Sequence, residues 1–444
     1  MVGIKTDAPS LALVGVGGFG PVHIANIHRL AQAGQAQLAA LISGGGLARL
    51  GETVPANIAA FAASVPGYPT LDDYLADGSV ADIVVLCTPI HTHVPLAIAA
   101  MKAGANVLLE KPPTPSLADF ERLLGVASDT GQAIQVGFQS FGSQALPALA
   151  AIIEDGVLGE VIGVGAVGTW SRSVAYFTRS SWAGKRTLDG VPVCDGVVTN
   201  PLAHAVATAL KIAGATRLGD LASVDLDLYR ANDIDCDDTS ALRCVTKGGV
   251  TVGLGLTLAA DEQASPYVTV RGTKGRATLF YADDLLKLAI QGQPETSETY
   301  GRTDLTENLI DHLRDPSVSL LCPLDEIGAF TTVLDTVASS ADPRRIPGSF
   351  LSRLERDGAT WVVVPKVDHW CRQVAEEAKT FAELGAPWVG AQRVIMDINF
   401  DGETVGRYVD GLDASALDCP RPHFHPLTTL GGVIVTDDSP PDHS

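Results

Sequence analysis

Short apolar runs alternate with helix-period segments along the first third of the chain. Short, mostly apolar runs are typical of strands buried on both faces, and the segments between them are long enough to cross back over a sheet. We therefore predict a parallel sheet covered by helices on both sides. The predicted strands are 11–16, 37–42, 82–87, 106–109 and 133–137, and the predicted helices are 21–33, 95–103 and 117–130.

The pattern changes after a helix predicted at 145–154. Strand-like runs joined by turn signals such as Lys247-Gly248-Gly249 now dominate, and one helix, at 201–213, interrupts them. This pattern favours a second, α+β domain with a mostly antiparallel open sheet. The predicted strands are 161–170, 223–230, 239–245, 251–258, 267–272 and 277–281, and helices are predicted at 306–314 and 324–339.

A third region follows Ile346-Pro347, with strands predicted at 359–364 and 393–400 and a helix at 368–384. Beyond Cys419 the chain is rich in Pro, Gly, Thr and Asp. The predicted domains are therefore residues 1–140, residues 141–348, and a C-terminal extension of residues 349–444.

Composition and charge narrow the possible functions. Hydrophobic residues make up 46% of the 444 residues and charged residues 18%, which excludes a largely disordered chain. The formal charge of −20 argues against binding to nucleic acid or to an anionic membrane. No apolar run is long enough for a membrane span, and the N-terminus lacks the pattern of a secretory signal. Seven dispersed cysteines without a C-x-x-C pair indicate reduced thiols, so we expect a cytoplasmic protein.

A glycine loop between the first predicted strand and helix carries the first chemical signal. Gly15-Val-Gly17-Gly18-Phe19-Gly20 fits the G-x-G-x-x-G spacing. In this context the glycines allow a tight turn, close approach of a pyrophosphate, and close packing of helix against strand. The unpaired N–H groups at the helix start suit phosphate. We therefore predict a Rossmann domain that binds a dinucleotide.

The end of the second predicted strand bears on the choice of cofactor. Ser43 stands where an acidic residue would bind the adenosine ribose of NAD, and Arg49 follows. Without a carboxylate a 2′-phosphate is not repelled, and Ser43 with Arg49 suits it, so NADP is favoured over NAD. A solvent-exposed helix charge is the alternative interpretation of Arg49.

Two further motifs follow strand ends, where ligands bind in an open parallel sheet. They are Thr88-Pro89-Ile90-His91-Thr92-His93 and Glu110-Lys111-Pro112. With the glycine loop and Val270-Arg-Gly272-Thr-Lys-Gly275, they resemble the glucose–fructose oxidoreductase/inositol dehydrogenase/MocA (Gfo/Idh/MocA) family over residues 10–345. The resemblance implies that Lys111 lies near the nicotinamide and the substrate hydroxyl, where it polarises the oxygen as hydride moves. It also implies that Thr88, Pro89, His91, His93 and Glu110 border the cofactor.

The second half of the predicted site lies around the helix at 201–213. The family pattern has an aspartate four residues before a histidine; here Asn200 and His204 occupy these positions. His204 is the candidate general acid–base, because imidazole titrates near neutral pH, whereas Asn200 can only hydrogen-bond and orient the substrate. A core histidine is the alternative for His204. Four further residues are candidates for binding a polyol: Tyr176, Trp182, Arg186 and Asp195, with Arg179 in the same loop. For Asp195, the alternative is a structural role in a turn.

The C-terminal segment resembles the start of a PmoA-like domain over residues 393–444. Arg421-Pro-His423-Phe-His425 and Pro441-Asp442-His443 belong to that resemblance. The segment is interpreted either as a truncated fusion or as a tail that docks on the other domains. The H-x-H spacing is compatible with metal ligands, but packing or loop roles are favoured and we predict no metal site.

Three functions remain open from the sequence. The favoured one is an NAD(P)-dependent oxidoreductase that acts on a small-molecule sugar, sugar acid or cyclitol, and the resemblance implies a homodimer or homotetramer. The second is a cofactor-retaining, glycosidase-like or cofactor-recycling enzyme. The third is a dinucleotide-binding scaffold or sensor without turnover, suggested by Asn200.

Overall fold

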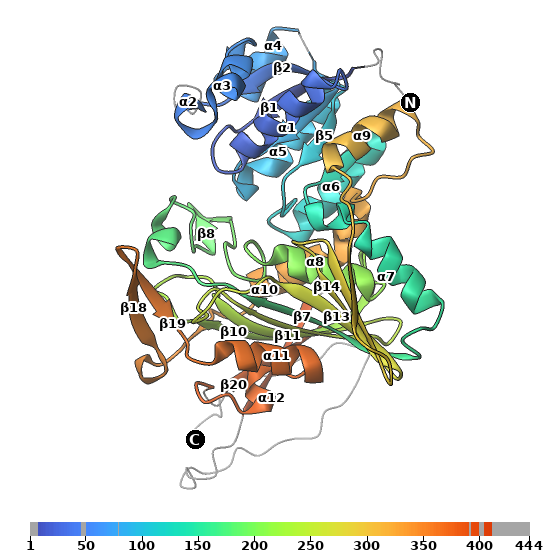
Figure 1. Ribbon diagram of the computed structural model, residues 1–444. Helices are drawn as coiled ribbons and strands as arrows, with labels where there is room; N and C mark the ends of the chain where they lie inside the picture. The colour runs from blue at the N-terminus through green and yellow to red at the C-terminus, as the bar shows by residue number, and fades with distance from the viewer. Residues whose placement is uncertain (1–7, 46–49, 79, 390–391, 399–403, 411–444) are drawn as a thin grey trace, which may run out of the picture.

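The first sheet contains six parallel strands in the order β3, β2, β1, β4, β5, β6 (Figure 1). The computed structural model describes residues 8–45, 50–78, 80–389, 392–398 and 404–410. The strand order reverses between β1 and β4, so their carboxyl ends open the crevice in which such sheets bind ligands. The strands are β1 (Ser10–Val14), β2 (Gln37–Ile42), β3 (Gly67–Tyr68), β4 (Ile83–Leu86), β5 (Asn106–Leu109) and β6 (Ile134–Val136). The helices are α1 (Gly20–Gln32), α2 (Leu50–Thr53), α3 (Ala56–Ala62), α4 (Leu71–Ala76), η2 (Ile90–Thr92), α5 (His93–Lys102) and α6 (Leu117–Thr130).

The second sheet is mixed but mostly antiparallel. Its main path runs β16, β15, β14, β13, β7, β12, β11, β10, β20, β21, and β17 pairs with β10. Only the pairs β7–β12 and β10–β17 are parallel among the described strands of this sheet. The strands are β7 (Val161–Thr169), β10 (Leu221–Arg230), β11 (Thr239–Thr246), β12 (Thr251–Thr257), β13 (Tyr267–Gly272), β14 (Gly275–Phe280), β15 (Leu285–Ile290), β16 (Thr296–Thr299), β17 (Arg344–Arg345), β20 (Gln392–Ile398) and β21 (Thr404–Asp410).

Helices cover both faces of this second sheet (Figure 1). Two helices, α8 (Ala203–Ile212) and α10 (Gly328–Ser339), lie between the sheet and the first domain, and α11 (Val367–Glu377) lies on the opposite face. Glycines allow α11 to approach closely: a Cβ added at Gly165 would lie 2.3 Å from Ala375 O, and one at Gly255 would lie 2.3 Å from Cys371 O. The two domains are therefore stacked, with α8 and α10 between the two sheets.

The remaining elements connect or flank these layers. They are η3 (Gln139–Gly142), α7 (Ala145–Glu154), η4 (Val174–Thr178), the β8 (Thr187–Leu188) and β9 (Val191–Pro192) hairpin, α9 (Leu305–Arg314), η5 (Leu324–Ile327), η6 (Gly348–Phe350), the β18 (Ser352–Arg356) and β19 (Ala359–Val363) hairpin, and α12 (Phe381–Leu384). Among the described residues, none of the helices is long and apolar enough to span a bilayer.

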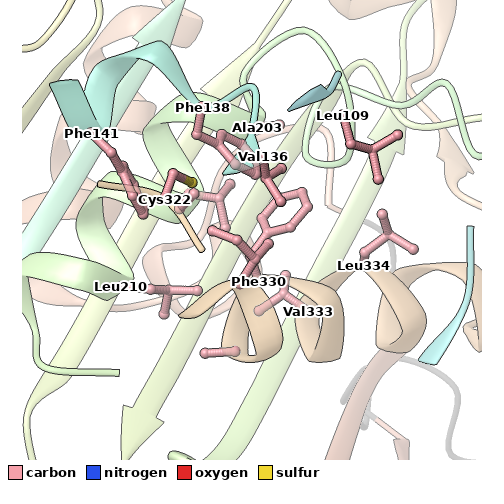
Figure 2. Packing of buried hydrophobic residues seen from close by; sticks show 14 of the residues in the cluster. Leu109, Val136, Phe138, Phe141, Ala203, Leu210, Cys322, Phe330, Val333 and Leu334 are labelled. Atoms are coloured by element: carbon pink, nitrogen blue, oxygen red, sulfur yellow. The ribbon is translucent and has the colours of Figure 1, made fainter. Parts of the chain in front are cut away.

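A cluster of buried side chains joins the two domains directly behind the candidate site. Phe138, at the end of β6, packs against Phe330 of α10 and Phe141 of η3, with ring centroids 5.0 and 5.9 Å apart (Figure 2). Leu109 of β5 and Leu210 of α8 belong to the same cluster. Because these residues come from the first sheet and from the helices that cover the second sheet, the cluster fixes α8 relative to the end of β5.

The structure divides the chain differently from the predicted boundaries. Helix α9 packs on the first domain, because Leu305, Leu309 and Ile310 join its core cluster, and Arg29 of α1 pairs with Glu307 at 2.6 Å. Residues 349–389 do not form a separate extension: β19, α11 and α12 belong to a core cluster of the second sheet.

Three predicted helix boundaries are corrected. The helix expected at 368–384 is two helices, because Ala378 adopts a left-handed backbone with φ 50° and Thr380 caps α12. The helix expected at 324–339 begins as η5, and the helix expected at 201–213 begins at Ala203.

Candidate active site

The glycine loop lies at the carboxyl end of β1. Its first and last glycines pack closely against neighbouring backbone, and the glycines between them face open space. A Cβ at Gly15, where φ is +91°, would lie 2.1 Å from Cys87 O, and one at Gly20 would lie 2.6 Å from Gly15 O. Gly17 and Gly18 have open space around their Cβ positions, and no side chain caps α1. The loop therefore has the close packing and the uncapped helix start that a pyrophosphate requires.

Two other predicted cofactor residues flank this loop. Phe19 is 45% exposed, and its ring lies 5.6 Å from that of His23. Ser43 directly follows β2, where its N–H donates to Tyr68 O at 2.9 Å. Arg49 lies outside the described residues. Ser43 is thus at the strand end that was expected to face the adenosine ribose.

The segment after β4 is braced by His93. Its side chain is buried, with Nδ1 3.0 Å from Pro112 O and Nε2 2.8 Å from Thr88 O, and burial lowers its pKa. His93 therefore links the ends of β4 and β5. Pro89 directly precedes η2, and the Nδ1 atom of His91 is buried without a hydrogen-bond partner among the described residues.

Glu110 contacts protein groups through both of its carboxylate oxygens, and its role beside the cofactor stays a prediction. His23 Nε2 lies 2.9 Å from Oε1, Gln139 Nε2 donates to the same oxygen at 3.4 Å, and the Lys111 N–H donates to Oε2 at 3.1 Å. Both carboxylate oxygens are therefore engaged. Glu110 anchors the end of β5 to α1 and positions Lys111.

Lys111 connects the two domains. Its Nζ donates to Asn200 O at 2.9 Å and to Asn200 Oδ1 at 2.8 Å. An ammonium has three donors, so one N–H remains for a ligand. Burial lowers the pKa of Lys111, the Glu110 and Asp195 carboxylates raise it, and the Arg179 guanidinium lowers it.

Asp195 supports Asn200 from behind instead of facing a substrate, which corrects its predicted role. It is 3% exposed, and Asn200 Nδ2 donates to its Oδ1 at 2.6 Å. Arg179 Nη2 donates to both carboxylate oxygens, at 3.1 and 2.9 Å, and the Gly184 N–H donates to Oδ2 at 2.9 Å. Since lysine only donates and carboxylate only accepts, these contacts fix the orientation of the Asn200 amide.

Tyr176 and Trp182 enclose Arg179. Its guanidinium carbon lies 3.9 Å from the Tyr176 ring centroid and 4.7 Å from that of Trp182. The two predicted substrate aromatics therefore lie one contact away from Asp195. Both side chains are partly exposed.

His204 is neutral in the resting fold, which corrects the expectation that it titrates near neutral pH. Burial first, and then the positive charges of Lys111 and Arg302, lower its pKa to about 3. Ser140 Oγ, which accepts from Thr208 Oγ1 at 2.9 Å, lies 3.3 Å from Nδ1. The Ser140 hydroxyl proton is then available for Nδ1, and on this basis we assign the ring proton to Nε2. Asn200 precedes α8, so Asn200 and His204 do not share one helix face. Lys111 nevertheless affects both residues: it donates hydrogen bonds to Asn200, and its positive charge lowers the pKa of His204.

Arg186 does not belong to the site. Its Nη2 donates to three carbonyl oxygens at the end of α10, those of Val337, Ala338 and Ser340, at 3.0, 2.9 and 2.8 Å. A guanidinium at a helix C-terminus satisfies carbonyls that the helix leaves unpaired. Arg186 is therefore a structural cap and not the predicted substrate ligand.

Two residues that support the site were missed from the sequence. His23 and Ser140 lie beside Glu110 and His204. His23 is a polar residue on the buried side of α1, which is the signal that could have found it. No group of three metal-ligating side chains occurs among the described residues, and His423, His425 and His443 lie outside them.

Comparison with known proteins identifies the family of the first domain. Residues 10–138 match a family model described as an oxidoreductase family with an NAD-binding Rossmann fold (GFO_IDH_MocA). The first domain belongs to the Gfo/Idh/MocA family. An inositol 2-dehydrogenase from Leifsonia xyli subsp. xyli is 34% identical over 161 residues, 35% of this chain and 44% of that protein. The chain thus spans less than half the length of the curated relatives it matches.

Solved structures of two dehydrogenases share the fold of most of the chain. The WlbA dehydrogenase from Bordetella pertussis, in complex with NADH and UDP-GlcNAcA, has a TM-score of 0.61 at 21% identity, covering 75% of this chain and 95% of that chain. An inositol dehydrogenase homologue from Azotobacter vinelandii, complexed with NADH and myo-inositol, has a TM-score of 0.60 at 18% identity, covering 76% and 96%. Residues 396–444 match a family of unknown function (DUF6807), so the PmoA-like resemblance stays a prediction.

Proposed function

We propose that this chain is a nicotinamide-dependent oxidoreductase that acts on a CH–OH group of a sugar, sugar acid or cyclitol. The observation that carries the proposal is Lys111. Its Nζ is placed at the end of β5, in a Gfo/Idh/MocA Rossmann domain, and is held by Asn200 of the second domain. Relatives and neighbours named for inositol or for a nucleotide sugar support this substrate class.

The residues of the first domain fit a dinucleotide. Gly17 and Gly18 leave room above an uncapped helix start for the pyrophosphate, and the segment 88–93 borders the same crevice. A bound nicotinamide ring supplies or accepts the hydride. The chain itself must hold the substrate carbon in line and handle the charge and proton of its oxygen.

Lys111 has the geometry for this proton. With two of its N–H groups donated to Asn200, its third is directed by elimination to the substrate oxygen. When the substrate is reduced, Lys111 donates a proton to the oxygen; when the substrate is oxidised, neutral Lys111 accepts one. A pKa below that of ordinary lysine makes both directions easier near neutral pH.

His204 orients the substrate oxygen and does not deliver the proton. Its pKa of about 3 leaves almost no imidazolium to act as an acid. The Nε2–H of a neutral imidazole still donates a hydrogen bond. We therefore assign proton transfer to Lys111 and alignment to His204 and Asn200.

We also propose NADP as the preferred cofactor. The support is the absence of a carboxylate at position 43, where Ser43 follows β2. A 2′-phosphate therefore meets a hydroxyl instead of a negative charge. A cytoplasmic protein remains our expectation; the described cysteines are all free thiols.

The homodimer or homotetramer implied by the resemblance remains a proposal. Because α11 covers β7 and β12 on the face away from α8, a partner on that side would contact α11 rather than the strands. Light scattering on the full chain tests the oligomeric state, and a monomer at micromolar concentration would contradict it.

The test of the proposed function is a titration with NADPH and NADH, followed by nicotinamide fluorescence. We expect saturable binding of both, with NADPH tighter. Turnover is then assayed with cyclitols and sugar acids for the wild type and Lys111→Met. Failure of both dinucleotides to bind at millimolar concentration would refute the proposal. A nicotinamide signal in the purified protein would indicate a retained cofactor, and binding without turnover of any polyol would favour the scaffold.

A further inference from the structure

A stack of arginines and aromatic rings extends from the candidate site. Arg179 lies between Tyr176 and Trp182, and Arg172 lies between Tyr176 and Trp170, with its guanidinium carbon 5.4 and 4.6 Å from their ring centroids. The order is therefore Trp170, Arg172, Tyr176, Arg179, Trp182. We call these five residues the arginine–aromatic stack. Cations over aromatic faces attract the ring quadrupole, and the planar guanidinium is held in one orientation.

The backbone under the stack is firmly held. The Trp170 N–H donates to Thr257 O and the Arg172 N–H donates to Leu258 O, each at 2.9 Å. In this extended segment residues 170 and 172 lie on one side. Ser173 forms a bridge with Trp361 of β19, so the hairpin from the C-terminal region supports the start of η4. The stack is thus an ordered feature of the second domain.

The two arginines of the stack differ in charge compensation. Arg179 is paired with Asp195 at 2.9 Å. Arg172 Nη1 donates to the Ser171 carbonyl at 3.0 Å and to the exposed Gln263 Oε1 at 2.9 Å. None of these partners is charged.

Within the described part of the chain, no carboxylate lies within ion-pair distance of Arg172. Asp261 and Glu262 precede Gln263 in the same loop but stay beyond that distance. In a protein of net charge −20, this leaves a partly exposed cation uncompensated beside the site. An ordered guanidinium in this state suits a planar anion, because its fork can donate two parallel hydrogen bonds.

Short contacts connect this cation to the reacting centre. Lys111 binds Asn200, Asn200 binds Asp195, Asp195 binds Arg179, and Arg179 stacks on the ring that Arg172 also faces. Arg172 is therefore joined to Lys111 by one continuous set of contacts, beside which the Tyr176 and Trp182 side chains are partly exposed.

We propose that Arg172 forms a subsite for a carboxylate or phosphate group that the substrate carries away from its reacting carbon. This rests on the proposed function and narrows its substrate class to acidic or phosphorylated sugars. The partly exposed edges of the flanking rings border the sugar, and Arg172 binds the anion.

The test compares the binding of three probes to the full-length protein by calorimetry, with and without NADPH. The probes are D-glucose, D-glucuronate and D-glucose 6-phosphate. We expect the wild type to bind at least one anionic sugar about tenfold or more tightly than glucose, as a charged hydrogen-bonded pair predicts. The anionic sugar whose affinity exceeds that of glucose by the larger factor identifies the carboxylate or the phosphate as the ligand. Arg172→Gln should abolish the preference while keeping the affinity for glucose, and Arg172→Lys should keep part of it.

Arg122→Gln is the matched control. Arg122 is an exposed residue of α6 without a described ion pair, so its substitution changes the net charge equally. Equal affinity of the wild type for the three sugars, no binding of either anion at millimolar concentration, or equal losses in Arg172→Gln and Arg122→Gln would overturn the subsite. Dinucleotide binding, measured separately, tells whether the proposed function fails instead.

Discussion

Replacing His204 with glutamine tests whether this histidine is neutral in the folded protein. His204 lies in the first turn of α8, its ring centroid 5.3 Å from that of Phe138 and its Nδ1 3.3 Å from Ser140 Oγ. Glutamine keeps a polar side chain there but does not titrate. Any difference between the two proteins that changes with pH therefore reports the protonation of His204.

The sign of the effect follows from the direction of the pKa shift. In the unfolded chain the pKa is near 6.5, and in the fold burial and the charges of Lys111 and Arg302 lower it to about 3. Between these values the unfolded state binds more protons, so the wild type loses stability as the pH falls. From pH 7 to pH 5 the loss approaches about 2 kcal/mol, and partial exposure of the ring reduces it to about 1–2 kcal/mol.

The measurement is scanning calorimetry of the wild type, His204→Gln and a control, His369→Gln, at pH 5, 6 and 7. His369 is an exposed histidine of α11. We expect the Tm of His204→Gln to rise relative to the wild type between pH 7 and pH 5, by about 1 °C for each kcal/mol in a chain of this length. A constant Tm difference over this range would mean that His204 is not held neutral, and the assignment of proton transfer to Lys111 would lose its basis.

Three further substitutions separate the roles of other residues. Lys111→Met should lower the rate of hydride transfer by about a hundredfold or more while dinucleotide affinity, measured by fluorescence, is unchanged; a fully active variant would contradict the mechanism. Arg186→Met should lower Tm, since it removes charged hydrogen bonds of about 1.5–3 kcal/mol to the end of α10, without changing dinucleotide affinity; an unchanged Tm would refute the capping role. Gly255→Ala should destabilise by about 1–3 kcal/mol, because its Cβ would lie 2.5 Å from the Cα of Cys371, whereas Gly125→Ala, in the open on α6, should be neutral or stabilising. Equal Tm values for the two alanine variants would mean that α11 does not pack as described.

Local signals predicted many elements closely. Strand β2 at Gln37–Ile42 and helix α6 at Leu117–Thr130 match the predicted residues. Both ends of helix α6 have capping residues that can be recognised in the sequence. The Ser116 side chain accepts from the Asp119 N–H, and Gly131 adopts a left-handed backbone with φ 69°. The split between α11 and α12 was missed, although Thr380 and Glu383 form a capping box whose spacing is visible in the sequence.

Contacts between distant segments could not be predicted from such signals. Sequence motifs identified Lys111 and Asn200 separately as site residues. They did not predict the hydrogen bond between the two side chains, which are 89 positions apart in the sequence. Arg186 was assigned to the substrate because basic and aromatic side chains in its loop suit a polyol, yet its long side chain reaches carbonyls more than 150 residues away. The sequence shows that a guanidinium is present in the loop. The position of α10 in the fold determines that this guanidinium binds helix carbonyls and not a substrate.

Asparagine at position 200 follows from the buried carboxylate behind it. An aspartate there would place a carboxylate oxygen at about hydrogen-bond distance from Asp195 Oδ1, where Asn200 Nδ2 now donates at 2.6 Å. Two carboxylates that close do not both ionise, so one would retain a proton. The amide avoids this conflict, since it donates to Asp195 and accepts from Lys111. Because the nearest partner of Nζ is neutral, Lys111 lacks a directly bonded carboxylate that would raise its pKa. The exchange of a carboxylate for an amide therefore favours Lys111 as the residue that transfers the proton.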